Sequence, residues 1–145
     1  MKCVKVESYE QLNQAFDIRL KVFVEEQGVP RELEMDEYDD SPIACNHFIL
    51  LKDDKAIATG RWKEYEPEIA KMQRIAVLKP FRGLGAGKFL LEGMEKDARS
   101  QGYKASLLDA QCTAEHFYSK LGYNTESDEP FLDANIPHVR MRKML

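Results

Sequence analysis

The amino-acid sequence predicts a mixed α/β domain built around a largely continuous sheet. Short apolar runs typical of strands alternate with helix-like segments along the chain, and no repeat or low-complexity stretch interrupts them. A glycine-rich turn from Arg82 to Gly87 stands between one such strand and an amphipathic helix. The length of 145 residues suits one domain with a buried core, so residues 1–145 are expected to form a single domain.

The helices are indicated by spacing and by end signals. Ser8, followed three residues later by Gln11, is a capping-box pattern and predicts a helix that ends before Gly28. A second helix follows the glycine turn and ends at Gly102, and a third lies around residues 114–121. Strands are expected at residues 3–6, 47–51, 55–63, 69–78 and 106–110, near residue 123 and at 139–144.

Composition excludes several classes of protein. Apolar residues make up 43% and charged residues 32%, which is typical of globular domains, and the net charge of −4 argues against a nucleic-acid partner. The N-terminus turns polar too early for a signal peptide, and no apolar run approaches the ~20 residues of a membrane span. The three cysteines show no motif spacing, so we expect no disulfide framework and no metal site in a cytoplasmic protein without a membrane partner.

The glycine turn is the segment that carries the most chemical information. Alternating glycines let the backbone approach a ligand closely, and the free N–H groups that open the next helix form a cradle for phosphate. Arg82 and Lys88 add positive charge at the two edges. A phosphate loop of the GxxxxGK[ST] type is excluded, because Gly83 and Gly87 stand too close and Phe89 replaces the Ser/Thr; the GxGxxG dinucleotide pattern is absent too. A tight structural connection is the alternative interpretation.

Two blocks of residues resemble the GNAT superfamily of N-acetyltransferases. Arg82, Gly85 and Gly87 match the family's pyrophosphate signature Arg/Gln-x-x-Gly-x-Gly/Ala, which here follows the strand Ile75-Ala76-Val77. About 25 residues later the segment from Ala114 to Tyr123, with Phe117-Tyr118 and Leu121-Gly122 inside it, resembles the family's late helix. Further segments look like the small bacterial YjcF- and ElaA-type branch, namely Arg19 to Gln27, Asp109-Ala110-Gln111 and Ile136 to Val139.

The resemblance implies a fold, a donor and a set of roles. The fold would be a central mixed, mostly antiparallel twisted sheet of six to seven strands flanked by about four helices, and the acetyl donor would be acetyl-CoA. Backbone groups of Ile75 and Val77, on either side of Ala76, would bind the acetyl carbonyl and the pantetheine arm, which Gln111 could also contact. The pyrophosphate would be held by Arg82, Gly83, Leu84, Gly85, Ala86, Gly87 and Lys88.

Attack of an amine on a thioester requires a proton donor for the departing thiolate and a neutral amine. Tyr118 is the candidate acid, although its helical spacing is also a core spacing. Many relatives place a glutamate where this chain has Gln73, and an amide cannot accept a proton at neutral pH. Residues 25 to 40 hold eight acids, which form either a solvated acidic loop or an acceptor site in which Glu26, Glu34 or Asp36 attracts a cationic amine and relays its proton. His138 is a second candidate base.

The sequence therefore predicts an acetyl-CoA-dependent N-acetyltransferase that acts on the primary amine of a small molecule by direct attack in a ternary complex. A protein or peptide N-acetyltransferase is one alternative, and an acyl-CoA-binding sensor without turnover is another, which the departure at Gln73 favours. The acceptor is not identified by the sequence, and a homodimer, common in this family, is left open. Catalysis through Cys112 is disfavoured because no Cys/His pair accompanies it.

Overall fold

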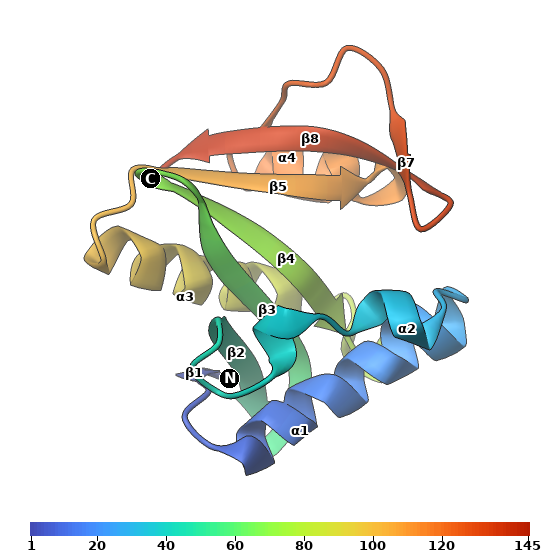
Figure 1. Ribbon diagram of the computed structural model, residues 1–145, viewed down its shortest axis with the longest axis vertical. Coiled ribbons are helices and arrows are strands. Elements are labelled where there is room, and N and C mark those ends of the chain that lie inside the picture. The colour runs from blue at the N-terminus through green and yellow to red at the C-terminus, as the bar shows by residue number, and fades with distance from the viewer.

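The computed structural model describes residues 1–145 as one eight-stranded sheet with helices on both faces (Figure 1). The strands are β1 (Lys2–Lys5), β2 (Asn46–Lys52), β3 (Lys55–Glu66), β4 (Ile69–Val77), β5 (Ala105–Gln111), β6 (Asn124–Thr125), β7 (Phe131–Asp133) and β8 (Ile136–Met144). The helices are α1 (Tyr9–Arg19), α2 (Arg31–Glu34), α3 (Ala86–Ser100) and α4 (Glu115–Lys120). A π-helical segment (Leu20–Glu26) continues α1, and short 3₁₀ turns cover Glu37–Asp39, Lys79–Phe81 and Cys112–Ala114.

The sheet order is β1-β2-β3-β4-β5-β8-β6, with β7 pairing beside β8. Every pair is antiparallel except β4 with β5, which run parallel. The expectation of a mixed, mostly antiparallel sheet with about four helices is confirmed. The structure has eight strands rather than six to seven: β6 corresponds to the strand expected near residue 123, whereas β7 is so short and exposed that no alternating buried stripe marks it in the sequence.

The α1 helix begins where the sequence predicts. The Ser8 hydroxyl accepts a hydrogen bond from the Gln11 N–H at 3.2 Å, and the Gln11 side-chain oxygen accepts one from the Glu7 N–H at 2.8 Å. These two bonds satisfy donors that the first helical turn leaves free. The helix then changes to π geometry over Leu20–Glu26 and places Val22 and Phe23 against the sheet.

Two apolar layers hold the helices on opposite faces of the sheet. The main core packs α3 and α4 against the sheet through residues such as Leu90, Leu91 and Met94. On the other face, α1 and its π-helical extension pack in two smaller clusters, through Leu12 and Ala15 and then through Ile18 and Val22. On that face α1 and α2 lie over the β1–β4 half of the sheet, and neither helix covers the β5–β8 half (Figure 1).

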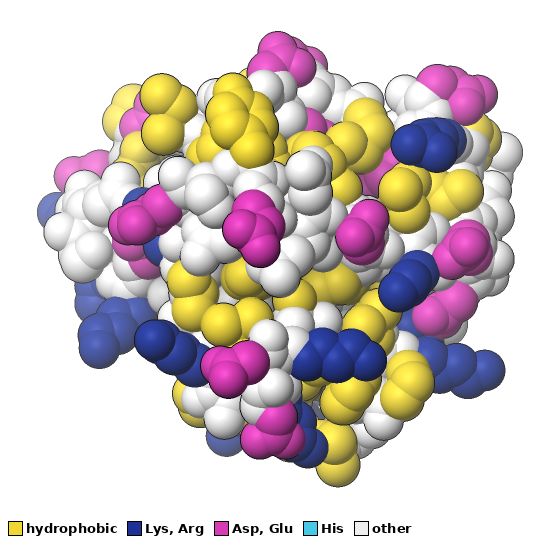
Figure 2. All heavy atoms as spheres, turned by 90° about the horizontal axis from the view of Figure 1, so that it is seen from below, with side chains coloured by type: hydrophobic (Ala, Val, Ile, Leu, Met, Phe, Trp, Pro, Cys, Tyr) yellow, Lys and Arg dark blue, Asp and Glu magenta, His cyan; other side chains and the backbone are white.

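On the face seen in Figure 2, lysines and arginines are interspersed with carboxylates, and apolar side chains lie at the floor of a hollow between them. The basic residues there do not gather into the continuous stripe that a nucleic-acid backbone requires. None of the helices is long and apolar enough to cross a membrane.

Candidate active site

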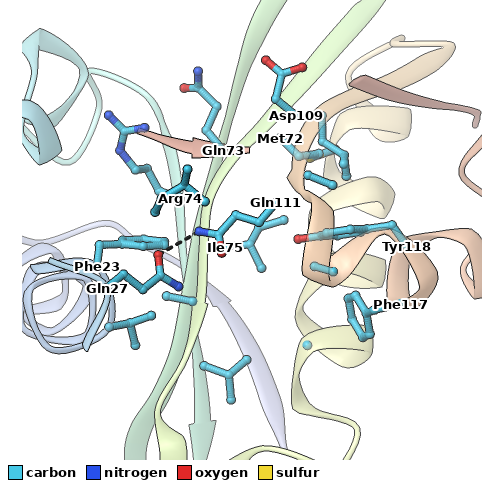
Figure 3. A pocket seen from close by; sticks show the side chains of 18 of the residues that line it. Phe23, Gln27, Met72, Gln73, Arg74, Ile75, Asp109, Gln111, Phe117 and Tyr118 are labelled. Carbon is cyan, nitrogen blue, oxygen red and sulfur yellow. Dashed lines mark hydrogen bonds between the residues drawn. The ribbon is translucent and has the colours of Figure 1, made fainter. Parts of the chain in front are cut away.

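The sheet splits where β4 and β5 part. Their parallel pairing runs from Ile69 opposite Ala105 to Met72 opposite Leu108 and then stops. Beyond this point the strands border a cavity of about 670 Å³, which is also lined by the π-helical segment, α2, the glycine turn, α4 and the β7–β8 hairpin. Figure 3 looks into this cavity, with β4 and the α1 side on one flank and α4 on the other.

A bulge in β4 shapes the wall of the cavity. Between the pairs Arg61/Gln73 and Thr59/Ala76, β4 has one residue more than β3. Arg74 lies at this point with φ of 56°, in the left-handed region that non-glycine residues rarely adopt. Such strained positions persist where the surroundings hold them, and they concentrate at functional sites.

Past the bulge, β4 presents unpaired backbone groups to the cavity. The Leu78 N–H donates to the Ile57 carbonyl of β3 at 2.9 Å, and hydrogen-bonding direction alternates along a strand. The backbone groups of Ile75 and Val77 therefore point away from β3, toward the gap. The Val77 carbonyl accepts a hydrogen bond from Arg82 Nε at 2.9 Å, which leaves the Ile75 groups open.

The glycine turn forms an unobstructed row of N–H groups at one end of the cavity. Gly83 and Gly85 have φ of 82° and 81°, and the chain leaves open space where a side chain at either would begin. The N–H of Phe89 donates to the Gly85 carbonyl and so makes the first hydrogen bond of α3. The N–H groups of residues 83–88 have no acceptor within the chain, as an anion cradle requires.

The charged groups beside this turn are exposed and form ion pairs at the surface. Arg82 pairs with Glu26 at 2.9 Å across the mouth of the turn, and Lys88 lies 4.0 Å from Glu92 on its own helix. Leu84 is 52% exposed. Leu84 and Lys88 do not line the cavity, whereas the other predicted residues of the turn do.

Tyr118 points its hydroxyl into the cavity from α4 (Figure 3). The side chain is 9% exposed, and no hydrogen bond joins its hydroxyl to the chain; since no fully buried side-chain oxygen lacks a partner, this hydroxyl is not fully buried. Burial raises the pKa of this phenol to about 12, so it stays protonated throughout the physiological range. Its ring packs edge-on against Phe117 and Tyr123, with centroids 5.0 and 6.0 Å away, which fixes its direction. Phe117 in turn lies over Gly87, where a Cβ would come within 3.0 Å of the ring.

A hydrogen bond crosses the cavity between its two flanks. Gln111 Nε2, at the end of β5, donates to Gln27 Oε1, just beyond the π-helical segment, at 2.8 Å (Figure 3). The structure thus places Gln111 at the cavity and pairs it with Gln27, the last residue of the Arg19-to-Gln27 segment.

Three arginines neutralise the acidic segment that precedes β2. Glu34, 4% exposed, accepts a hydrogen bond from Arg19 Nε at 2.8 Å and lies 3.4 Å from Arg74 Nε. Burial raises the pKa of Glu34 by more than these guanidiniums lower it. Asp36 pairs with Arg61 at 2.6 Å. Burial alone would raise the pKa of Asp36, but the hydrogen bond and charge of Arg61 hold it below its usual range.

Asp39 lies at the centre of this ion network. Its carboxylate accepts hydrogen bonds from Arg19 at 2.7 and 2.9 Å and from Arg61 at 2.8 Å. Burial opposes ionisation, but these bonds and charges outweigh it and hold the pKa of Asp39 far below its usual range. Of the four predicted acceptor residues, Glu34 and His138 line the cavity. Asp36 and Glu26 do not line it; Asp36 is paired with Arg61, and Glu26 is paired with Arg82.

A second cluster of charges surrounds Asp109, which lines the cavity from β5. Asp109 accepts two hydrogen bonds from Arg140, at 2.9 and 3.2 Å, and lies 3.3 Å from Lys71. Burial alone would raise the pKa of Asp109, but the hydrogen bonds and charges of Arg140 and Lys71 outweigh burial and lower it. Arg140 also donates to the Tyr65 hydroxyl at 2.9 Å. Asp109 stood inside a matching block, but nothing in the sequence marked Lys71 or Tyr65.

Gln73 of β4 also lines the cavity. Its side-chain oxygen accepts a hydrogen bond from Arg61 Nε at 3.2 Å. His138 lies on β8 directly opposite Gln111 in the pairing with β5, and it is 8% exposed. No group of three or more His, Cys, Asp or Glu residues is placed to hold a metal ion.

A sheet that parts at a parallel strand pair, with a free-amide turn at one end of the gap and a tyrosine at the other, is the architecture of an acyl-group transferase of the GNAT type. The model of the acetyltransferase (GNAT) domain family matches residues 4–145. The chain belongs to this family of acetyltransferases.

Relatives with known sequence or structure extend over the whole chain. The uncharacterized N-acetyltransferase YjcF of Bacillus subtilis is 40% identical over 143 residues, which cover 99% of each chain. A crystal structure of a Lactobacillus plantarum protein assigned as an N-acetyltransferase superposes with a TM-score of 0.90 at 29% identity, covering 99% of this chain and 97% of the other. Escherichia coli ElaA shares the fold, with a TM-score of 0.85 at 23% identity over 98% of each chain. The predicted YjcF/ElaA-like branch is confirmed.

Proposed function

We propose that this protein transfers an acetyl group from acetyl-CoA to a primary amine of a small-molecule acceptor, by direct attack within a ternary complex. The observation that carries the proposal is the single cavity that joins the free N–H groups of residues 83–88 to the unpartnered hydroxyl of Tyr118. One end suits a polyphosphate, and the other suits a leaving group that needs a proton.

The cavity fits acetyl-CoA on the chain's own geometry. Open space at Gly83 and Gly85 lets a pyrophosphate approach the free amides, and Arg82 can leave Glu26 to add its charge. The unpaired backbone groups of Ile75 lie where β4 has parted from β5, so they can bind an extended pantetheine arm as a missing strand would be bound. Acetyl-CoA supplies the activated acetyl group, and the chain supplies its alignment.

Tyr118 is proposed to protonate the departing thiolate. Its raised pKa keeps the proton on the phenol until the leaving group develops charge, and its hydroxyl is not committed to any other acceptor. The packed rings of Phe117 and Tyr123 hold it in one direction, which reduces the reorganisation that the proton transfer requires.

The proposed acceptor is small because two segments close the far end of the cavity. Leu33 and Glu34 of α2 line it from one side, and Asp133, Ala134 and Ile136 of the β7–β8 hairpin line it from the other. An extended peptide needs an open groove, whereas a compact amine needs only an enclosed end. Glu34 and His138 are the predicted acceptor residues that reach this end.

The proposal is tested first by binding and then by turnover. Acetyl-CoA should raise the apparent melting temperature of the protein, whereas adenosine should not, because it lacks the pyrophosphate. Release of free thiol should then be measured with primary amines in separate groups: diamines, amino sugars, amino acids and lysine peptides. Turnover confined to lysine peptides would identify a peptide acetyltransferase instead. Stabilisation by acetyl-CoA with no thiol release from any amine would identify a sensor, which Gln73 favours.

A further inference from the structure

The reaction requires a proton acceptor that β4 does not supply. An alkylammonium with a pKa of about 10.4 is neutral only about once in 2,500 molecules at pH 7, so unaided attack is slow. Gln73 of β4 lines the cavity, but an amide cannot accept a proton at neutral pH, and its oxygen already accepts a hydrogen bond from Arg61. Another group at the acceptor end of the cavity must take the proton.

His138 is held in one tautomer by the backbone. Its Nδ1 lies 2.6 Å from the carbonyl oxygen of Ile136, two residues earlier on β8. A carbonyl oxygen can only accept a hydrogen bond, so Nδ1 carries the hydrogen. In the neutral ring Nε2 therefore has a free lone pair, and that nitrogen is the one that can take a proton.

The free nitrogen of His138 is accessible, and the residue lines the cavity. Nε2 has no hydrogen-bond partner in the chain, yet no fully buried side-chain nitrogen or oxygen lacks a partner, so Nε2 must be reachable from outside. The residue lines the cavity although only 8% of it is exposed. The Phe131 ring stacks on the imidazole, with centroids 6.1 Å apart and planes at 25°, and holds its orientation.

We infer that His138 Nε2 accepts the proton of the acceptor ammonium before attack. The inference rests on the proposed acetyl transfer and names the base that this transfer needs. The ammonium N–H bond breaks and its proton passes to Nε2, directly or through one water. The neutral nitrogen then bonds to the thioester carbonyl carbon, the C–S bond breaks, and the sulfur takes a proton from Tyr118. Tyr118 recovers a proton from the new amide nitrogen, and His138 releases its own to solvent.

Glu34 is the strongest rival for this role. It also lines the cavity, and burial raises its pKa. However, Arg19 holds one of its oxygens at 2.8 Å and Arg74 lies 3.4 Å away, so an arriving ammonium would meet two cations beside it. His138 has no such cation against its free nitrogen.

Other titratable groups also line this cavity, and most of them are held in ion pairs. On the neighbouring strands these groups are Asp133 on β7, which has no ion pair, and the Asp109–Arg140 pair on β5 and β8. Across the cavity are the Glu34–Arg74 pair and the phenol of Tyr118. A rate limb that disappears in one variant and persists in the other therefore distinguishes His138 from Glu34.

The test replaces His138 with asparagine. In His138→Asn the amide nitrogen can still donate to the Ile136 carbonyl, while the group at the Nε2 position is lost. The same change at His116, which is exposed on α4, is the matched control. With the best primary alkylamine from the panel, His138→Asn should lower kcat/KM at pH 7 about 100-fold. Its deficit should shrink as the pH rises toward 10, because the amine then loses its proton in solution.

Three further readouts separate a base from a structural residue. His138→Asn should lose the acidic limb of the kcat/KM profile, and added imidazole should restore part of the rate. It should also acetylate an arylamine, already uncharged at pH 7, within about threefold of the wild type. The acetyl-CoA thermal shift should be unchanged.

The inference is overturned if His138→Asn keeps the acidic limb and stays within about threefold of the wild type with the alkylamine. Loss of that limb in Glu34→Gln instead would assign the role to Glu34. These outcomes require wild-type turnover, so they differ from failure of the proposed function itself, in which the wild type releases no thiol with any amine.

Discussion

The two ends of the cavity differ in the groups that form them. The cofactor end is made of backbone: a bulged strand edge and the N–H groups of residues 83–88, all within one short stretch of chain. The acceptor end is formed by side chains from α2, β4, β5, β7 and β8, and an ion network that includes Arg19 of α1 and Arg61 of β3 is joined to it through Glu34. A site made of backbone groups tolerates changes of side chain. A site made of paired side chains does not, because the same residues determine the specificity and stabilise the fold. Each variant below tests this difference.

Tyr118→Phe should have the largest effect. The reacting sulfur loses its proton donor, so kcat should fall about 10³-fold, while the acetyl-CoA thermal shift stays within about 1 °C of the wild type. Because the pKa of Tyr118 is raised to about 12, the phenol should produce no falling limb in the wild-type rate profile below about pH 11. Stopped-flow and steady-state thiol release measure both quantities. Tyr9→Phe, at an exposed position, is the control; equal loss in both variants would contradict the acid role.

Asp39→Asn should damage the acceptor end through the fold. The change leaves Arg19 and Arg61 with an uncompensated buried charge, so the free energy of unfolding should fall by about 3 kcal/mol in urea denaturation at pH 7. The pKa of Asp39 is lowered in the folded protein, so its contribution is present above about pH 4 and is lost as the pH falls further.

The difference between Asp39→Asn and wild type should therefore shrink in acid. Asp128→Asn, an exposed acid with no ion pair, should match wild type at every pH. A difference that stays constant from pH 7 to pH 3 would mean that the ionisation of Asp39 is not what stabilises the network.

Gly85→Ala should weaken the cofactor end by a smaller amount. Its φ of 81° costs a residue with a Cβ about 1–2 kcal/mol, which should raise the KM for acetyl-CoA about tenfold as the N–H row is displaced. Gly102→Ala has the same backbone strain, at φ of 92°, but lies at the far end of α3. The two variants should lose similar stability, and only Gly85→Ala should change KM. A change of KM in both would show that strain, not the cradle, is responsible.

Gln27→Ala should have the smallest effect because it removes only the hydrogen bond between Gln27 and Gln111 across the cavity. Its removal frees the Gln111 amide, so acetyl-CoA should bind about twofold to fivefold more tightly, in line with the ~1 kcal/mol of one hydrogen bond. Isothermal titration calorimetry measures this change. Gln101→Ala, which removes a hydrogen bond to Asp97 on the surface of α3, should leave the affinity unaltered. Weaker binding in Gln27→Ala would instead mean that Gln27 itself contacts the cofactor.

The same contrast explains what could be predicted from the sequence. The glycine turn, its flanking strand and the Tyr118 helix are local patterns, so their positions follow from spacing within a few residues. The left-handed backbone at Arg74 has no such signal, since glycine or asparagine usually marks it. The Asp109–Arg140 and Arg61–Asp36 pairs join residues 31 and 25 positions apart, and no periodicity encodes them.

The ion network beside the cavity also shapes how this protein could acquire new acceptors. Arg19, Arg61 and Arg74 balance Glu34, Asp36 and Asp39, so the six charges cancel only as a set. Replacement of one member leaves a buried charge without its partner, which lowers the free energy of unfolding whatever its effect on substrate binding. A directed-evolution library that varies Glu34 alone should yield mostly unstable proteins. Libraries that vary Glu34 together with Arg74 should yield folded ones, so acceptor specificity in this scaffold is expected to evolve by paired substitutions.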